Sequence, residues 1–228
     1  MSLAGENRLI KSYVLRSGRM SDAQKRSYEN LASSFCVNSE KIIYKEIFGN
    51  ENPVIVEIGF GSGSATASLA ESNPNMNYLG IEVYRAGIGR LLWEIEKRSL
   101  KNIRIIEGDA AEILCGRLPE NEAAGFHVFF PDPWPKKRHH KRRLVTRPFT
   151  GALCNCLRPG GYIYMVTDWV DYAEWALREL GETPGLVNQY EGFASPQEWR
   201  PRTRFETRGL NRNYQITELF FKREMNGQ

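Results

Sequence analysis

Pro-Val-Ile-Val-Glu-Ile-Gly-Phe-Gly-Ser-Gly, residues 53–63, is the stretch that decides the fold. Its run of β-branched side chains predicts a buried strand. Gly59, Gly61 and Gly63 then allow a tight turn whose backbone can approach a ligand closely. Residues 64–72 follow with a helical pattern. The stretch therefore predicts a strand, a glycine loop and a helix in succession, the arrangement found in nucleotide-binding folds.

The rest of the chain alternates between short apolar strands and amphipathic helices. Strands are predicted at residues 53–58, 76–81, 103–106, 125–130, 161–166 and 215–221, and helices at residues 64–72, 84–98 and 171–180. This alternation predicts an α/β fold with a mostly parallel, doubly wound sheet and helices on both faces.

The length of 228 residues suits one domain with appendages. We expect a polar N-terminal extension at 1–52, with helices at 22–31 and 40–48, a main domain at 53–222 and a tail at 223–228. No apolar segment has the length of a signal peptide or a membrane span, and four cysteines do not make a disulfide framework. The expected location is the cytoplasm, with no membrane partner and no metal.

Acidic residues lie at the carboxyl ends of all five strands before the last one. They are Glu57, Glu82, Asp109, Asp132 and Asp168. In a doubly wound sheet, ligands bind beyond the carboxyl ends of the strands, at the point where the strand order reverses. These side chains are therefore expected to gather around one site.

The acids near the glycine loop distinguish between two adenosine-containing cofactors. Glu82 ends the second strand, where an acid meets the ribose hydroxyls of NAD or S-adenosylmethionine. Glu57 would repel a pyrophosphate but favours the sulfonium and amino groups of S-adenosylmethionine. Asp109 can accept a hydrogen bond from the adenine amine, or cap the next helix, and the two roles are compatible. The pattern predicts S-adenosylmethionine as the cofactor.

Asp132 lies between Pro131 and Pro133 in the loop after the fourth strand. Proline removes backbone freedom, so the loop should hold Asp132 in place. Methylation of guanine N7 needs in-line placement more than acid–base work, because N7 has a free lone pair. The product is cationic, and fixed carboxylates favour it. The alternative is a structural turn in which Trp134 packs on the core.

Residues 136–143, Lys-Lys-Arg-His-His-Lys-Arg-Arg, hold six positive charges and no negative ones. The chain has 31 Lys and Arg against 27 Asp and Glu, a net charge of +4, so the remainder is slightly acidic. Such a run is most often a solvated surface. Because it follows Asp132 closely, we expect it at the mouth of the site, where it would neutralise RNA phosphates. A second basic cluster comprises Arg200, Arg202, Arg204, Arg208 and Arg212, and we expect it to form a second positive rim at the ligand edge.

Six motifs along the chain agree with one known family. They are Gly-Arg-Met-Ser-x-Ala-Gln at 18–24, Glu-Ile-Gly-Phe-Gly at 57–61, Gly-Asp-Ala at 108–110, Phe-Pro-Asp-Pro-Trp-Pro-Lys at 130–136, Arg-His-x-Lys-Arg-Arg at 138–143 and Thr-x-Phe-Glu-x-Arg-Gly at 203–209. Together they resemble the tRNA (guanine-N7-)-methyltransferases. The resemblance implies a class I, Rossmann-like methyltransferase fold with an antiparallel last strand, S-adenosylmethionine as donor, and a guanosine in the variable loop of tRNA as acceptor.

The resemblance also implies roles for individual residues. The cofactor site would comprise Glu57, Gly59, Gly61, Gly63, Glu82, Asp109 and Asp132, with Asp132 also the catalytic residue. Substrate contacts would come from Lys136, Asp168, Thr203, Arg204, Phe205 and Glu206. The RNA-contacting segment would comprise Arg138, His139, His140, Lys141, Arg142 and Arg143. The chain departs from the family where Arg212-Asn213 replaces an expected Gly-His pair.

Two other functions remain open at this point. One is a methyltransferase that acts on an adenine amine or a protein side chain, and the other is a non-catalytic RNA-binding protein on the same scaffold. The oligomeric state, monomer or homodimer, is also open.

Overall fold

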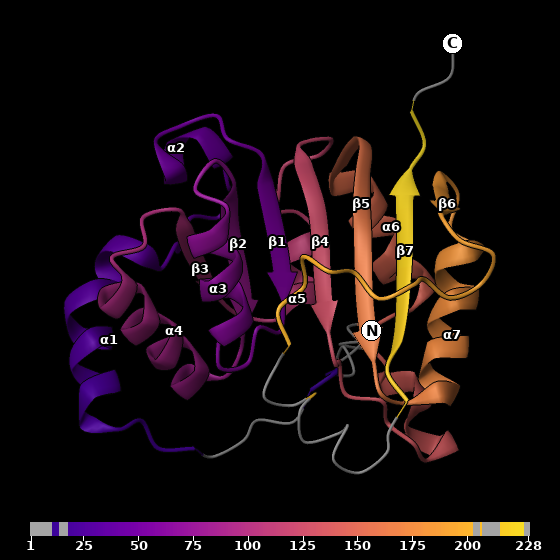
Figure 1. Cartoon of the computed structure of the whole chain (residues 1–228), viewed down its shortest axis with the longest axis horizontal. Coiled ribbons are helices and arrows are strands. Elements are labelled where there is room, and N and C mark those ends of the chain that lie inside the picture. Colours follow the sequence, from indigo (N-terminus) through magenta and orange to yellow (C-terminus); the bar gives the residue numbers. More distant parts are fainter. Residues whose placement is uncertain (1–10, 14–17, 203–205, 207–214, 226–228) are drawn as a thin grey trace, which may run out of the picture.

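The computed structural model describes residues 11–13, 18–202, 206 and 215–225. They build a seven-stranded sheet with the order β3-β2-β1-β4-β5-β7-β6 (Figure 1). The strands are β1 (Val54–Ile58), β2 (Asn77–Glu82), β3 (Ile103–Glu107), β4 (Ala123–Phe129), β5 (Leu157–Thr167), β6 (Leu186–Asn188) and β7 (Thr217–Arg223). Strands β1 to β5 pair in parallel, whereas β7 is antiparallel to both β5 and β6. The predicted fold class is confirmed.

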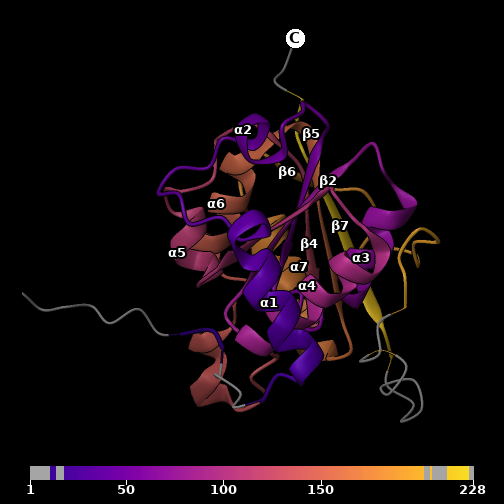
Figure 2. The ribbon, with the colours of Figure 1, turned by 90° about the vertical axis from the view of Figure 1, so that its left-hand side faces the viewer.

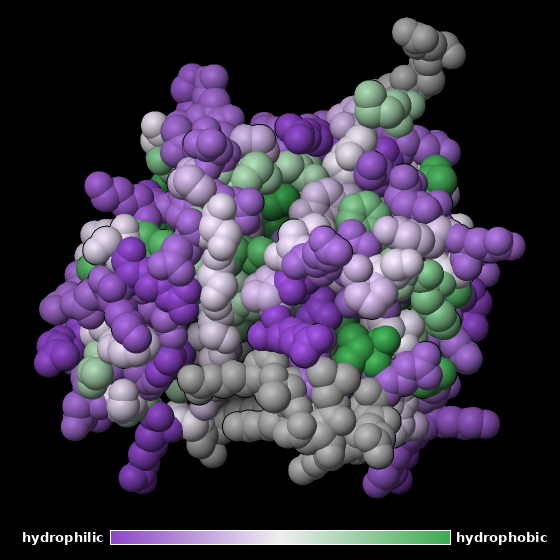
Figure 3. All heavy atoms as spheres, viewed as in Figure 1, coloured by the Kyte–Doolittle hydropathy of each residue, from purple (hydrophilic) through white to green (hydrophobic). Residues whose placement is uncertain are grey.

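Helices cover both faces of the sheet, and α5 and α6 lie on the opposite side from α3 (Figure 2). The helices are α1 (Asp22–Phe35), α2 (Tyr44–Phe48), α3 (Ser64–Ser72), α4 (Arg85–Arg98), α5 (Ala110–Leu114), α6 (Arg147–Cys156) and α7 (Val170–Gly181), with a 3₁₀ helix, η1, at Lys137–Arg142. None of the helices described is both long and apolar enough to cross a membrane. Hydrophilic side chains cover the outer surface around α1 and α4 (Figure 3).

The strand side chains divide into two apolar layers. Val54, Val56 and Ile58 of β1 face the layer that includes α2, α5, α6 and α7. Ile55 faces the opposite layer, which includes α3 and α4 and is joined by partly buried residues of α1. Both faces of β1 are thus buried, which is why four of its five residues are apolar and do not alternate with polar ones.

The structure contains α5, α6 and β6, which the sequence analysis did not predict. Helix α5 has five residues and β6 has three, so neither is long enough to show a period. Helix α6 has Pro148 in its first turn, where a proline is tolerated because its missing N–H would have no helical partner. Strand β5 then follows α6 directly and begins four residues earlier than residue 161, the start that was predicted.

Residues before the sheet pack closely on α4. A capping box between Ser21 and Gln24 starts α1. A Cβ at Gly89 would lie 2.4 Å from the sulfur of Met20, so a larger residue there would displace this side chain. After α1, the Val37 N–H donates to the Ile105 carbonyl on β3 at 2.7 Å. The segment from 18 to 37 is therefore docked along the β3 side of the sheet.

We expect Gly87→Ala to destabilise the protein by about 1–3 kcal/mol, the usual range for an added group in a packed contact. A Cβ on Gly87 would lie 2.1 Å from the carbonyl oxygen of Gly61, so α4 or the glycine loop would have to move. Gly151→Ala in α6 is the matched control, because no atom lies within 4 Å of its Cβ position. The control should leave stability unchanged or raise it by about 1 kcal/mol. Urea unfolding measures both, and equal effects would contradict the close contact.

Candidate active site

The glycine loop uses its three glycines in two ways. Gly59, Gly61 and Gly63 all have positive φ, at 70°, 58° and 68°, a region that favours glycine. No atom lies within 4 Å of a Cβ position on Gly59 or Gly61, so these two border open space that a ligand can enter. A Cβ on Gly63 would lie 2.7 Å from the side chain of Leu91, so this glycine lets α3 approach α4.

Glu82 braces the glycine loop from the end of β2. Its Oε2 accepts a hydrogen bond from the Gly61 N–H at 2.7 Å. Its Oε1 accepts from the N–H groups of Val83 and Tyr84 at 2.8 and 3.0 Å. The predicted ribose acid thus lies beside the loop, and its position is fixed by three backbone donors.

Glu57 lies beneath the glycine loop, and its residue is 2% exposed. The Thr66 hydroxyl donates to its carboxylate at 2.7 Å. Burial raises the pKa of Glu57 to about 7; the Thr66 hydrogen bond opposes this rise and the nearby Glu82 charge adds to it. Glu57, which was predicted to lie at the donor site, is therefore a buried carboxylate that changes charge near neutral pH.

Asp109 follows β3 and caps α5. Its Oδ1 accepts a hydrogen bond from the Ala111 N–H at 2.9 Å. The structure confirms the capping role expected as one of two compatible roles, and it keeps Asp109 at the same sheet edge as Glu82 because β2 and β3 pair in parallel.

The loop after β4 holds Asp132 between two strained residues. Phe130 and Trp134 have φ values of 51° and 48°, a left-handed conformation that costs a bulky side chain about 1–3 kcal/mol. The Phe130 N–H donates to the Val166 carbonyl on β5 at 2.8 Å, and the Trp134 indole N–H donates to the Ser12 carbonyl at 3.0 Å. These contacts fix both ends of a loop in which Asp132 is half-buried.

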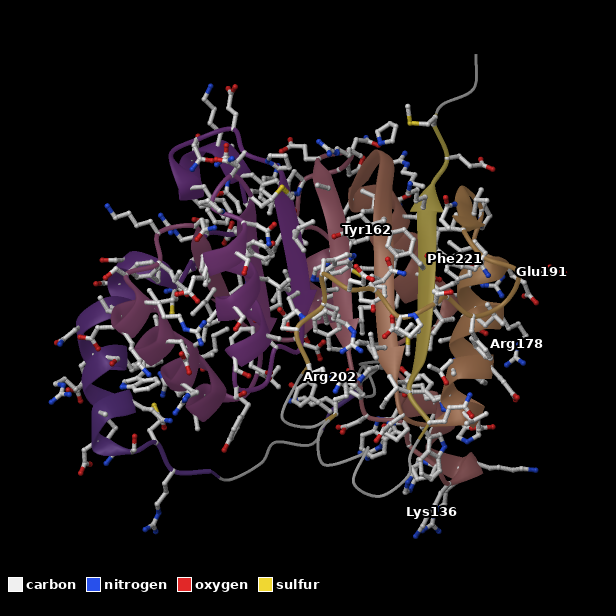
Figure 4. All side chains as sticks on the ribbon, in the orientation of Figure 1. Lys136, Tyr162, Arg178, Glu191, Arg202 and Phe221 are labelled. Carbon is white, nitrogen blue, oxygen red and sulfur yellow. The ribbon has the colours of Figure 1, made fainter. Side chains whose placement is uncertain are left out.

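Asp168 lies at the end of β5, next to the Asp132 loop, because β4 and β5 are parallel neighbours. It is half-buried, and its burial raises its pKa. Lys136 is exposed at the same edge, beyond the carboxyl ends of β4 and β5 (Figure 4). The structure thus brings Asp132, Asp168 and Lys136 to the edge that also carries the glycine loop.

The basic segment forms η1, and its members differ in exposure. Lys137, Arg138 and Lys141 are exposed. Arg142 lies over the Trp134 ring at 4.9 Å. The pKa of His139 is lowered, by partial desolvation and by the surrounding cations, so this histidine does not add to the positive charge near neutral pH.

Arg143 differs from the expectation that the whole segment lies at the surface, where it could contact RNA. Its side chain is only 1% exposed and is paired with Asp171, so it is not one of the exposed cations of the segment. The carboxylate and two aromatic rings that surround it all come from α7, which lies far along the sequence from the basic run.

Glu206 and Arg200 also differ from expectation. The residue Glu206 is 4% exposed, and its two carboxylate oxygens accept from the Arg200 guanidinium at 2.6 and 2.8 Å. Arg200 also donates to Glu218 at 2.9 Å and to the Tyr164 hydroxyl at 3.1 Å. The predicted substrate contact Glu206 is therefore held in a buried ion network, and Arg200 does not belong to an exposed basic rim.

A pocket of about 380 Å³ borders this network, lined in part by Gln197, Arg202, Glu206 and Ile216. Arg202 lies on the segment that crosses the front of the sheet (Figure 4). The other predicted substrate residues, Thr203, Arg204 and Phe205, lie outside the described residues. Sequence reasoning missed the ion network because folding brings Tyr164 of β5 and Glu218 of β7 to the Arg200 side chain.

In the part of the chain that the structure describes, no group of three or more His, Cys, Asp or Glu side chains could hold a metal ion. His127 is buried on β4, and burial lowers its pKa to about 3. Its Nε2 lies 3.0 Å from the Tyr162 hydroxyl. It is therefore a neutral residue of the sheet.

Solved methyltransferases share this architecture. The 16S rRNA methyltransferase KamB superposes with a TM-score of 0.58 at 17% identity, covering 92% of this chain and 96% of that one. The aminoglycoside resistance methyltransferase NpmB1 gives 0.52 at 15% identity, covering 80% and 94%. Sheet order and glycine loop together define a class I, S-adenosylmethionine-dependent methyltransferase fold.

Relatives by sequence show to which family of methyltransferases the chain belongs. Residues 51–219 match a family model described as "Putative methyltransferase". The tRNA (guanine-N(7)-)-methyltransferase of Nitrosospira multiformis is 44% identical over 220 residues, which cover 96% of each chain. That of Treponema pallidum is 46% identical over 242 residues, covering 94% of this chain and 96% of the relative. The chain belongs to the tRNA (guanine-N(7)-)-methyltransferase family.

We expect Arg200→Ala to lower the free energy of unfolding by about 3–5 kcal/mol, because it leaves Glu206 and Glu218 buried without their cation. Arg202→Ala is the matched control. Arg202 is exposed, so its loss should change stability by no more than about 0.5 kcal/mol. Urea unfolding compares the two variants, and similar losses would contradict the separate role of Arg200.

Proposed function

We propose that this chain transfers a methyl group from S-adenosylmethionine to N7 of a guanosine in the variable loop of tRNA. The observation that carries the proposal is the strained loop that holds Asp132 at the same sheet edge as Asp168 and continues directly into an exposed basic helix. The names and the 44–46% identity of the relatives support the same acceptor.

The residues around the glycine loop fit this cofactor. The open space over Gly59 and Gly61 gives a ligand access to the backbone. Glu57, Glu82 and Asp109 make the surroundings acidic, which opposes a pyrophosphate and favours a cationic ligand without phosphate. When bound, S-adenosylmethionine supplies an electrophilic methyl group on a sulfonium.

The acceptor side requires orientation and charge stabilisation. Guanine N7 attacks through its own lone pair, so no residue has to remove a proton first. Positive charge develops on the base during transfer, and the carboxylates of Asp132 and Asp168 lie where they can stabilise it. The hydrogen bonds that hold Phe130 and Trp134 in their strained conformations keep Asp132 in a fixed position before the substrate arrives.

Exposed cations beside the loop suit the phosphates of the RNA. Lys136, Lys137, Arg138 and Lys141 are all exposed around η1. Neutralising several phosphates makes binding strongly dependent on salt concentration. The base would then enter the acidic edge while the backbone lies along the basic segment.

We expect the wild-type protein to methylate unmodified tRNA at N7, and Asp132→Asn to abolish the transfer while leaving tRNA affinity nearly unchanged. The amide keeps the size of the side chain but removes the charge that stabilises the product. Transfer of labelled methyl groups measures the activity, and cleavage by reduction and aniline identifies N7-methylguanosine. Label without cleavage would overturn the N7 assignment, and no label on RNA would indicate another acceptor.

Affinity for the donor should rise as the pH increases from 6 to 8. The pKa of Glu57 is raised to about 7, so the group is protonated below this pH and ionised above it. Only the ionised form attracts a cationic donor, and one titrating group changes affinity by at most about tenfold per pH unit. Calorimetric titration of wild type and Glu57→Gln measures the contribution of Glu57. Equal pH dependence in both would assign the titration to another group.

Without the donor, the stability of the folded protein should fall as the pH rises. Because the folded pKa of Glu57 lies above its ordinary value of 4.5, the folded state binds the proton more tightly than the unfolded state. This contribution is full below pH 4.5 and is lost as the pH rises through 7. Glu57→Gln should therefore show a flatter decline of stability over this range.

A further inference from the structure

Arg143 is buried within the basic segment and contacts three different parts of the site. Its Nε donates to the Pro133 carbonyl at 3.1 Å, in the loop that carries Asp132. Its terminal nitrogen donates to the Asp171 carboxylate on α7 and lies 3.2 Å from Nε2 of His140. One guanidinium thus joins the loop after β4 to the helix after β5.

Aromatic side chains of α7 enclose the same guanidinium. The Arg143 guanidinium carbon lies 5.1 Å from the ring centres of both Tyr172 and Trp175. The chain just after Arg143 is fastened to these residues as well. The Val145 N–H donates to the Tyr172 hydroxyl at 3.2 Å, and the Trp175 indole N–H donates to the Val145 carbonyl at 2.7 Å.

The two segments that Arg143 joins are those with the acceptor-side acids. Pro133 directly follows Asp132, and Asp171, in the first turn of α7, follows Asp168 by three residues. The loop also contains the left-handed residues Phe130 and Trp134, and such a conformation persists only where its surroundings hold it. A planar guanidinium presents its five donors in a rigid fork, whereas an ammonium is a compact charge with three rotatable donors.

We propose that Arg143 is a positioning residue that holds Asp132 and Asp168 in the relative arrangement required for methyl transfer, and that it makes no contact with tRNA phosphates. The proposal rests on the proposed function of this site. It separates Arg143 from Lys141, which lies two residues earlier in the same basic segment and is exposed.

Arg143→Lys tests the proposal because it retains the charge and loses the planar fork. We expect kcat for tRNA methylation to fall about 10- to 100-fold, the scale of a misplaced reacting group. The KM for tRNA should stay within about twofold, and the salt dependence of tRNA binding should not change. Lys141→Ala should give the opposite result, with a higher KM and a salt slope reduced by about 1.

Two further variants separate positioning from a loss of folding. Arg178→Ala removes an exposed arginine that also lies over the Trp175 ring, and we expect wild-type kcat. Asp171→Ala removes a partner whose side chain is 61% exposed, so the fold should tolerate it while kcat falls. Arg143→Lys should lower kcat less in the Asp171→Ala background than in wild type, because the two residues act together.

Amide hydrogen exchange gives a readout that does not depend on activity. Peptides covering residues 130–137 should exchange faster in Arg143→Lys than in wild type or Arg178→Ala. Exchange could be faster in Arg143→Lys while the wild type does not methylate tRNA. This result would overturn the proposed function but would still show that Arg143 holds the loop that contains Asp132. Wild-type kcat in Arg143→Lys, or a salt slope reduced as in Lys141→Ala, would overturn the positioning role.

Discussion

Parallel pairing of strands β1 to β5 brings all their carboxyl ends to one edge of the sheet, and the whole candidate site depends on this constraint. Residues that lie far apart in the sequence are thereby brought to the same edge. Glu82 reaches Gly61 because β1 and β2 are adjacent, and Asp132 lies near Asp168 because β4 and β5 are adjacent. The reversal of strand order between β1 and β4 leaves space for a ligand where these pairs meet.

This constraint explains how much could be predicted from the sequence. A strand, its carboxyl end and the first polar residue beyond it are local features, so short apolar runs located β1 to β5 and the acid at each end. Residues 110–114 and 186–188 form elements too short to show a period, and these were missed. Residues 147–156 were missed although Pro148 stands where a helix tolerates it. The sequence pattern therefore predicted the topology of the sheet more reliably than the number of helices and strands.

The sequence pattern could not predict in which direction each side chain of a charged run points. Residues 136–143 look uniform, but Lys141 faces water and Arg143 faces α7. The difference arises from the Asp171 carboxylate and the aromatic rings of α7, which follow in the chain only after another helix and strand. In the second basic cluster, Arg200 is likewise buried because Glu206 and Glu218 are within reach of its guanidinium. Pairs that form only after folding leave no mark in local composition.

A count of positive residues consequently overstates the surface available to RNA. A buried guanidinium needs a carboxylate and further hydrogen-bond acceptors, because losing its hydration is costly. Arg143 and Arg200 both have such partners, and each connects segments that flank the candidate site. Exposed lysines have no comparable constraint and stay hydrated until a phosphate replaces the water. Within one basic segment, a carboxylate within reach therefore decides whether a cation is buried in the structure or stays at the surface.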